Sequence, residues 1–235
     1  MATETLNSIL SSFPTRVDAK DDTNADRDAL LERRFATRSN SLGHVEYIFE
    51  LGNWGVGGHL DRSETKKYGS LLQILQYPFS KGSIHVKSED PSRGLRADLA
   101  IDPQYFGGEN GRLDLEIAMH AHRFAERICS TQPLAAILRE QVWPVAGDTK
   151  RDDDLRAWLK KVVTTDWHPV GTCAMGGKAG AGGGVVDERL RVYGVHGLRV
   201  ADASVMPMQI SAHLQATVYA IAEKAAAMIL EHHRM

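Results

Sequence analysis

Apolar and polar side chains alternate along two short segments of the chain, and this pattern is typical of β-strands. Within residues 44–51 an apolar or aromatic side chain occupies every second position from Val45 to Leu51, and residues 83–88 alternate in the same way. We expect the second segment to be a half-buried strand. Apolar runs at 71–77 and 99–101 stand next to turn-forming residues. Several short strands joined by turns favour a sheet that is at least partly antiparallel.

Helical periodicity marks three longer segments, at 113–128, 152–163 and 214–230. The middle segment is the clearest, because it begins with three aspartates that complement the helix dipole. Its apolar side chains fall on one face, namely Leu155, Trp158, Leu159 and Val162. Two further helices are expected at 3–12 and 28–36, with a polar loop between them.

The last third of the chain differs in composition from the rest, because it contains a glycine-rich segment and short apolar segments. Six of the nine residues at 176–184 are glycine, which predicts a loop. Short apolar segments at 185–187 and 198–202 then predict two strands before the last helix. The expected fold class is α+β, a mixed α/β arrangement with an antiparallel sheet, flanking helices and a C-terminal strand–helix segment.

Composition narrows the function classes. The formal net charge of -2 gives no electrostatic reason to expect nucleic acid or an anionic membrane as a partner. No apolar run is long enough to cross a bilayer, and the first residues lack the features of a secretion signal, so cytoplasmic is the default expectation. Cys129 and Cys173 form no disulfide framework, and without a C-x-x-C spacing we expect no metal centre.

Two histidines carry the most distinctive chemistry. His168 lies in the segment Asp-Trp-His-Pro-Val-Gly-Thr-Cys-Ala-Met-Gly at 166–176, and His213 follows 45 residues later. A glycine-rich turn and a short apolar strand separate them, so the chain can return the second imidazole to the first. Imidazole is the side chain best suited to moving a proton near neutral pH.

The order of motifs in this region resembles the C-terminal portion of the glucose-methanol-choline oxidoreductase family, which comprises FAD-dependent alcohol oxidases and dehydrogenases. The most specific motifs are Trp-His-Pro-Val-Gly-Thr-Cys at 167–173, Gly-Gly-Val-Val-Asp at 183–187 and Gly-Leu-Arg-Val-Ala-Asp-Ala-Ser-Val-Met-Pro at 197–207. The resemblance implies a partial substrate-binding domain at 1–165. Residues 166–235 would supply the catalytic-histidine loop and the C-terminal segment of the FAD-binding domain.

The resemblance also implies roles for the two histidines. His168 corresponds to the base that takes the hydroxyl proton of an alcohol, while a hydride leaves the same carbon for the flavin. His213 corresponds to the partner that hydrogen-bonds the substrate oxygen. From the residues alone, His168 could instead bond to the backbone of a turn, and His213 could serve only the start of a helix.

Six further residues correspond to positions that face the cofactor in this family. They are Trp167, Asp202, Ala203, Gln215, Ala216 and Thr217. Other readings stay open, because Asp202 could cap the turn that follows it and a large aromatic such as Trp167 is often plain core. The helix start at 215–217 would direct backbone N–H groups, and the positive end of the dipole, towards the flavin.

The family's opening Gly-x-Gly-x-x-Gly turn, which holds the FAD pyrophosphate, does not occur in this sequence. We therefore expect a partial chain, and no tight FAD binding by this chain alone. Exposed apolar faces would favour a homo-oligomer or a complementary half as partner, beside a small-molecule alcohol substrate. The alternatives are a non-catalytic remnant or accessory domain without FAD, and a lyase that cleaves cyanohydrins with the same histidines.

Overall fold

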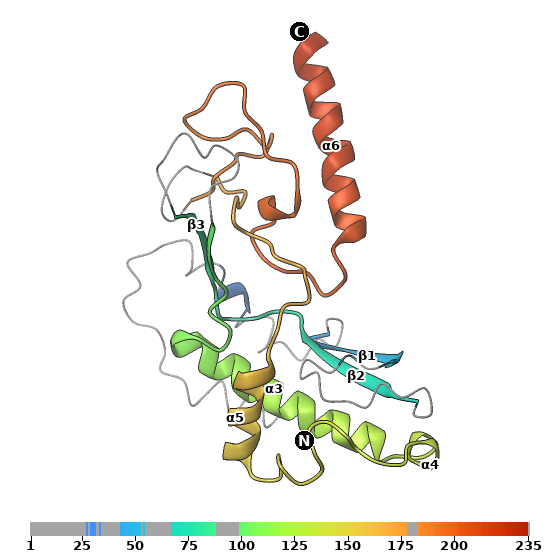
Figure 1. The fold of residues 1–235 in the computed structure, drawn as a ribbon. Coiled ribbons are helices and arrows are strands. Elements are labelled where there is room, and N and C mark those ends of the chain that lie inside the picture. Colours follow the sequence, from blue (N-terminus) through green and yellow to red (C-terminus); the bar gives the residue numbers. More distant parts are fainter. Residues whose placement is uncertain are drawn as a thin grey trace. The chain divides into compact units, whose positions relative to one another are not determined.

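The computed structural model describes residues 27, 29–31, 33, 43–52, 54, 67–87, 99–177 and 183–234 (Figure 1). These residues form two compact units. One contains the described parts of 1–42, 82–103 and 165–235, and the other contains those of 43–81 and 104–164. Both units combine helices with a two-stranded antiparallel sheet. The α+β class expected from the sequence is therefore confirmed.

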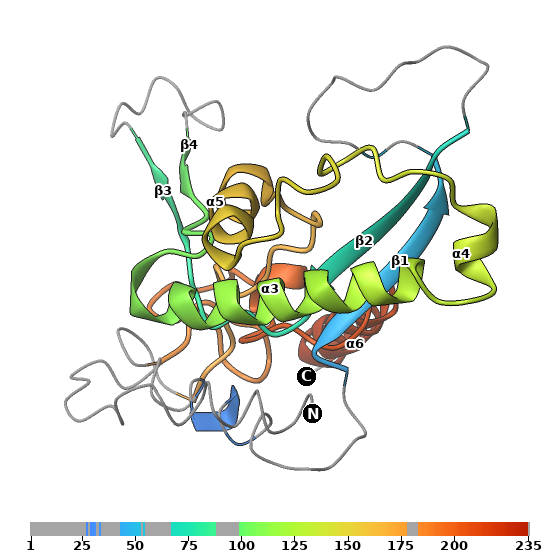
Figure 2. The same ribbon diagram turned by 90° about the horizontal axis from the view of Figure 1, so that it is seen from below.

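The unit formed by 43–81 and 104–164 contains a hairpin of β1 (Val45–Leu51) and β2 (Gly69–Leu75). The strands pair antiparallel from Val45 opposite Leu75 to Leu51 opposite Gly69. The strand expected at 44–51 is thus confirmed, and it begins one residue later than the pattern. Figure 2 shows the hairpin of β1 and β2 extending at an oblique angle to α3, and Figure 1 shows α5 crossing α3.

Helix α3 (Gly108–Cys129) begins five residues before the predicted start at Leu113. The sequence pattern missed this first turn because residues 108–112 carry no apolar periodicity. Two glycines make the turn sterically feasible. Gly108 has a φ of +63°, and a Cβ at Gly111 would lie 2.0 Å from the carbonyl carbon of Phe106. The backbone N–H of Gly111 donates to Gly107 O at 2.9 Å.

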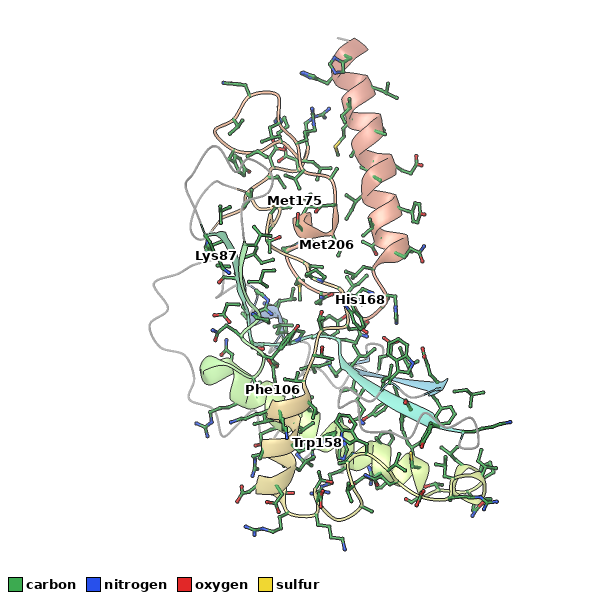
Figure 3. The ribbon with its side chains drawn as sticks, in the orientation of Figure 1. Lys87, Phe106, Trp158, His168, Met175 and Met206 are labelled. Carbon is green, nitrogen blue, oxygen red and sulfur yellow. The ribbon has the colours of Figure 1, made fainter. Side chains whose placement is uncertain are left out.

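Helix α5 (Asp152–Val162) confirms the prediction for 152–163, and a short helix, α4 (Leu134–Ile137), precedes it. The predicted apolar face of α5 is the one that packs on α3. The core cluster consists of Leu115, Met119, Leu155 and Leu159, with Phe106, Ala118 and Trp158 against it (Figure 3). Leu155 is completely buried, so this cluster is the centre of the unit.

Four of the described polar residues are buried in the same unit, namely Gln76, Asp114, His122 and Thr149. Asp114 accepts hydrogen bonds from the backbone N–H groups of Phe79 (2.8 Å) and Ser80 (2.7 Å), which ties the segment after β2 to α3. His122 lies against the ring of Trp158, with 5.2 Å between the ring centroids. Burial lowers the pKa of His122, the nearby Glu126 opposes that shift, and Arg123 adds to it.

The other unit contains β3 (Ser83–Val86) and β4 (Leu99–Asp102), which pair antiparallel. The strand expected at 83–88 is present but shorter, and the expectation that it is half-buried is wrong. All four residues of β3 are exposed, with Ile84 opposite Ile101 and Val86 opposite Leu99. The physical reason is that a lone hairpin buries little beyond its cross-strand contacts.

The strands predicted at 185–187 and 198–202 are not formed as such. The structure has single bridges instead, between Val186 and Val192 and between Arg191 and Arg199. Turns interrupt the chain every few residues. One is built on Asp187, whose carboxylate accepts from the backbone N–H groups of Arg189 and Arg191, each at 2.9 Å. These side-chain bonds compete with a regular ladder.

Helix α6 (Gln215–Arg234) confirms the helix expected at 214–230. One narrow face of α6 packs on the turn region through Ile221 and Ala225. The core cluster is Val186, Leu190, Val205 and Ala225, with Val192, Val200 and Ile221 against it. Apolar side chains elsewhere are exposed, as the sequence predicted, including Leu198, Tyr219 and Leu230. The helices expected at 3–12 and around 28–36 lie largely outside the described residues, although positions 29–31 are helical.

Candidate active site

The structure brings His168 and His213 together. Their ring centroids lie 4.9 Å apart and the ring planes are nearly perpendicular, at 84°. His168 belongs to the loop that follows α5 (Figure 3), and His213 lies two residues before the start of α6 in the sequence. The juxtaposition expected from the sequence is confirmed, although the described residues between the two histidines form turns and bridges rather than strands.

Backbone hydrogen bonds explain why the two segments meet. The N–H of Cys173 donates to Ser204 O at 3.0 Å, and the N–H of Met175 donates to Val205 O at 2.9 Å. Residues 171–175 therefore run beside the short 3-10 helix η2 (Ala203–Val205). Gly171 has a φ of +86°, a conformation that favours glycine. This turn carries the chain from His168 to the paired segment.

A side-chain bond fixes the backbone at His168 itself. The side-chain amide of Gln209 donates to the carbonyl oxygen of His168. Gln209 precedes His213 by four residues, so this bond joins the two histidine segments directly. Its effect is to hold the peptide of His168 against the loop that leads into α6.

Asp166 lies next to the ring of His168. Its Oδ2 is 2.9 Å from His168 Nδ1, close enough for an ion pair. The ring N–H is not aligned with this oxygen, and among the described residues no donor meets hydrogen-bond geometry with it, although the oxygen is buried. The site therefore holds two imidazoles and one carboxylate, a set that can accept, hold and donate protons.

Trp167 stands between Asp166 and His168 with its side chain 68% exposed. Its φ of +57° is uncommon for a large side chain. The N–H of Trp167 donates to Thr165 Oγ1 at 2.8 Å, which supports this turn. The exposed ring is therefore not part of a core in this structure.

The other residues singled out from the sequence lie on η2 and at the start of α6. Asp202 caps η2, because its carboxylate accepts from Ser204 N at 2.8 Å, and Ala203 is the first residue of η2. The first hydrogen bond of α6 is donated by Val218 to Leu214 O. The N–H groups of Gln215, Ala216 and Thr217 precede it, so they form the positive end of the helix.

The described residues show neither a metal-binding cluster nor a membrane-spanning helix. They contain no group of three or more histidine, cysteine, aspartate or glutamate side chains that could hold a metal ion. In the same part of the chain, no helix combines the length and the apolar character that a membrane span requires.

Comparison with known proteins identifies the family. The sequence model of the GMC oxidoreductase family matches residues 78–222, which is more than half of the chain. The chain therefore belongs to the GMC oxidoreductase family, and the resemblance inferred from its motifs is confirmed. The match includes His168, His213 and the first turn of α6.

A dehydrogenase named mpl7 from Monascus purpureus is 42% identical over 205 residues, which are 86% of this chain and 31% of the relative. Pyranose dehydrogenase 2 from Leucoagaricus meleagris is 35% identical over 80% of this chain and 31% of its own length. The chain thus spans about a third of the length of these relatives.

An FAD-dependent oxidoreductase from Chaetomium thermophilum has the same fold as this chain. The structures agree with a TM-score of 0.75 over 100% of this chain and 37% of the other, at 23% sequence identity. At that identity the likeness concerns the fold alone.

The sequence did not predict the contacts that Asp166 and Gln209 make with His168. Asp166 stands two residues before His168, but that spacing brings the two side chains together only because Trp167 between them is left-handed. Nothing in the local sequence pointed to Gln209, whose partner lies 41 residues away.

Proposed function

We propose that this chain supplies the proton-transferring part of an FAD-dependent oxidoreductase that acts on the CH–OH group of a small alcohol. The observation that supports this most directly is the pair of rings of His168 and His213, 4.9 Å apart, within the region that matches the family. By role, residues 1–165 would belong to the substrate-binding domain. Residues 166–235 would provide the histidine loop and the C-terminal segment of the FAD-binding domain.

In this proposal His168 is the base. Its imidazole takes the hydroxyl proton as the C–H bond of the same carbon breaks, and the substrate leaves as a carbonyl compound. Removing the proton makes the carbon a better hydride donor. A positioned base of this kind contributes roughly 10²–10⁴-fold in rate.

His213 is the partner that binds the substrate oxygen. An N–H of this ring donates to the oxygen and stabilises the negative charge that develops there. The exposed ring of Trp167 is proposed to line the approach to the same site.

The residues at η2 and at the start of α6 suit the flavin ring system of FAD. FAD, when bound, supplies the hydride acceptor. The N–H groups of Gln215, Ala216 and Thr217 favour negative charge near them by about 0.3–1 kcal/mol, and the small exposed Ala216 leaves room for a flat ring. Asp202 and Ala203 are proposed as further contacts. The chemistry of this donor set fits the cofactor.

The experiment uses FAD-loaded protein that carries this chain. A panel of primary, secondary and aromatic alcohols is mixed with it without oxygen, and bleaching of flavin absorbance is followed by stopped flow. His168→Ala should slow the bleaching by roughly 10²–10⁴-fold. His213→Ala should both slow the bleaching and raise the substrate concentration that gives half of the limiting rate. The control is His196→Ala, which changes an exposed histidine in a turn between two glycines.

A His168→Ala variant with a near-normal bleaching rate would remove His168 from the role of base. Protein that bleaches with none of the alcohols but releases cyanide and a carbonyl compound from a cyanohydrin would favour the lyase alternative. Protein that binds no FAD at all would favour an accessory domain.

A further inference from the structure

Asp166 is a charged group at the site whose contacts have no explanation in the proposed reaction so far. Its Oδ2 is a buried oxygen for which no donor among the described residues has hydrogen-bond geometry. Most buried polar atoms have a partner, and exceptions call for a reason. The ion pair described for this oxygen is the one with His168 Nδ1, at 2.9 Å.

The distance is already that of a charge-assisted hydrogen bond, and only the direction of the ring N–H is wrong. The backbone around the pair is fixed on both sides. The left-handed turn at Trp167 is supported by Thr165, and Gln209 holds the carbonyl of His168. Because the backbone is held in this way, we expect the ring of His168, and not the loop, to move when the N–H aligns with Oδ2.

The contact between Asp166 and His168 affects which nitrogen of the ring carries the proton. A neutral imidazole carries its proton on one nitrogen and a lone pair on the other. A carboxylate beside Nδ1 favours the form with the proton on Nδ1, because the other form would place a lone pair against the negative oxygen. The lone pair is then on Nε2, on the opposite edge of the ring. The same carboxylate stabilises the imidazolium that forms when Nε2 takes a proton.

We propose that Asp166 is the positioning residue of His168: it holds the proton on Nδ1, so that Nε2 is the atom that accepts the proton of the alcohol. This inference rests on the proposed function for its purpose, but the tautomer itself does not. Asp166 touches neither substrate nor cofactor in this proposal and acts only through the ring of His168.

The first test reads the tautomer directly and needs no activity. Nitrogen-15 correlation spectra of the histidine rings are recorded on the full chain at alkaline pH, where free imidazole is neutral. His168 should carry its proton on Nδ1. In Asp166→Asn the signal should move towards a mixture of both tautomers, whereas Asp148→Asn, an exposed aspartate in a turn, should leave it unchanged. Wild-type protein with the proton on Nε2 would overturn the proposal.

The second test uses the FAD-loaded protein and the stopped-flow assay. Asp166→Asn should lower the limiting rate of flavin bleaching by about tenfold or more, with the substrate dependence unchanged, and Asp166→Glu should restore part of the rate. A wild-type limiting rate in Asp166→Asn would exclude the positioning role. If His168→Ala does not slow the reaction, the proposed function is wrong. The tautomer measured for the wild-type ring still shows whether Asp166 holds the proton on Nδ1. If Asp166→Asn does not fold, by circular dichroism, the wild-type tautomer is decisive.

Discussion

The helical pair α3–α5 and the histidine region of residues 166–213 are built in different ways. The helical pair is regular, and its core contains four apolar side chains at helical spacing. The histidine region has one three-residue helix and single bridges, and it is held by backbone and side-chain hydrogen bonds. The helical pair is therefore stabilised by packing at helical spacing, whereas the histidine region combines a small core of Val186, Leu190 and Val205 with turns whose hydrogen bonds set the site geometry.

The largest change in stability is expected from a substitution in the core of the α3–α5 pair. Replacing Leu155, completely buried in the core cluster, by alanine should lower the free energy of unfolding by about 2–5 kcal/mol, because it removes contacts and leaves a cavity. Urea unfolding followed by the fluorescence of Trp143 and Trp158 measures this. Ile137→Ala, at an exposed position of α4, is the matched control and should change stability by about 0.5 kcal/mol or less. Equal effects of both substitutions would contradict the assigned core.

A smaller effect is expected in the histidine region. Gly171→Ala should destabilise by about 1–2 kcal/mol, because a φ of +86° is unfavourable once a Cβ is present. The added Cβ would lie 3.6 Å from Met206 O, an ordinary contact, so the strain is conformational rather than steric. Denaturant titration measures the change. Gly177→Ala, with open space around the position, should be neutral, and a loss of equal size there would refute this account.

The smallest change in stability at neutral pH is expected from His122. This residue should make the stability of the unit that contains α3 depend on pH. Burial lowers its pKa from the ordinary 6.5, so below pH 6.5 the unfolded chain binds a proton that the folded chain resists. Stability should therefore fall as the pH drops below 6.5, until the folded-state pKa is reached. Melting temperatures across this range measure the slope. His122→Phe should flatten it, whereas His120→Phe, at an exposed position of the same helix, should not. An unchanged slope in His122→Phe would assign the acid sensitivity to other groups.

The sequence was a good guide where periodicity and burial agree. The bounds of β1 and of α5 were each predicted to within one residue. The sequence was a poor guide where turns determine the local structure, or where no second element covers a strand. The glycine-containing first turn of α3 has no apolar pattern, the strand expected at 185–187 became a turn built on Asp187, and β3 is exposed because a lone hairpin covers neither of its own faces.

By itself, the sequence determined the family, the helices with an apolar stripe and the two histidines as a pair, because these depend on motif order and local periodicity. Only the tertiary structure decided that Asp166 lies 2.9 Å from His168 Nδ1, that Gln209 holds the His168 carbonyl, and that Asp202 caps η2. Such contacts depend on the direction in which each turn sends its side chains. That direction is set by backbone angles and by hydrogen bonds to residues distant in the chain, which no local pattern encodes.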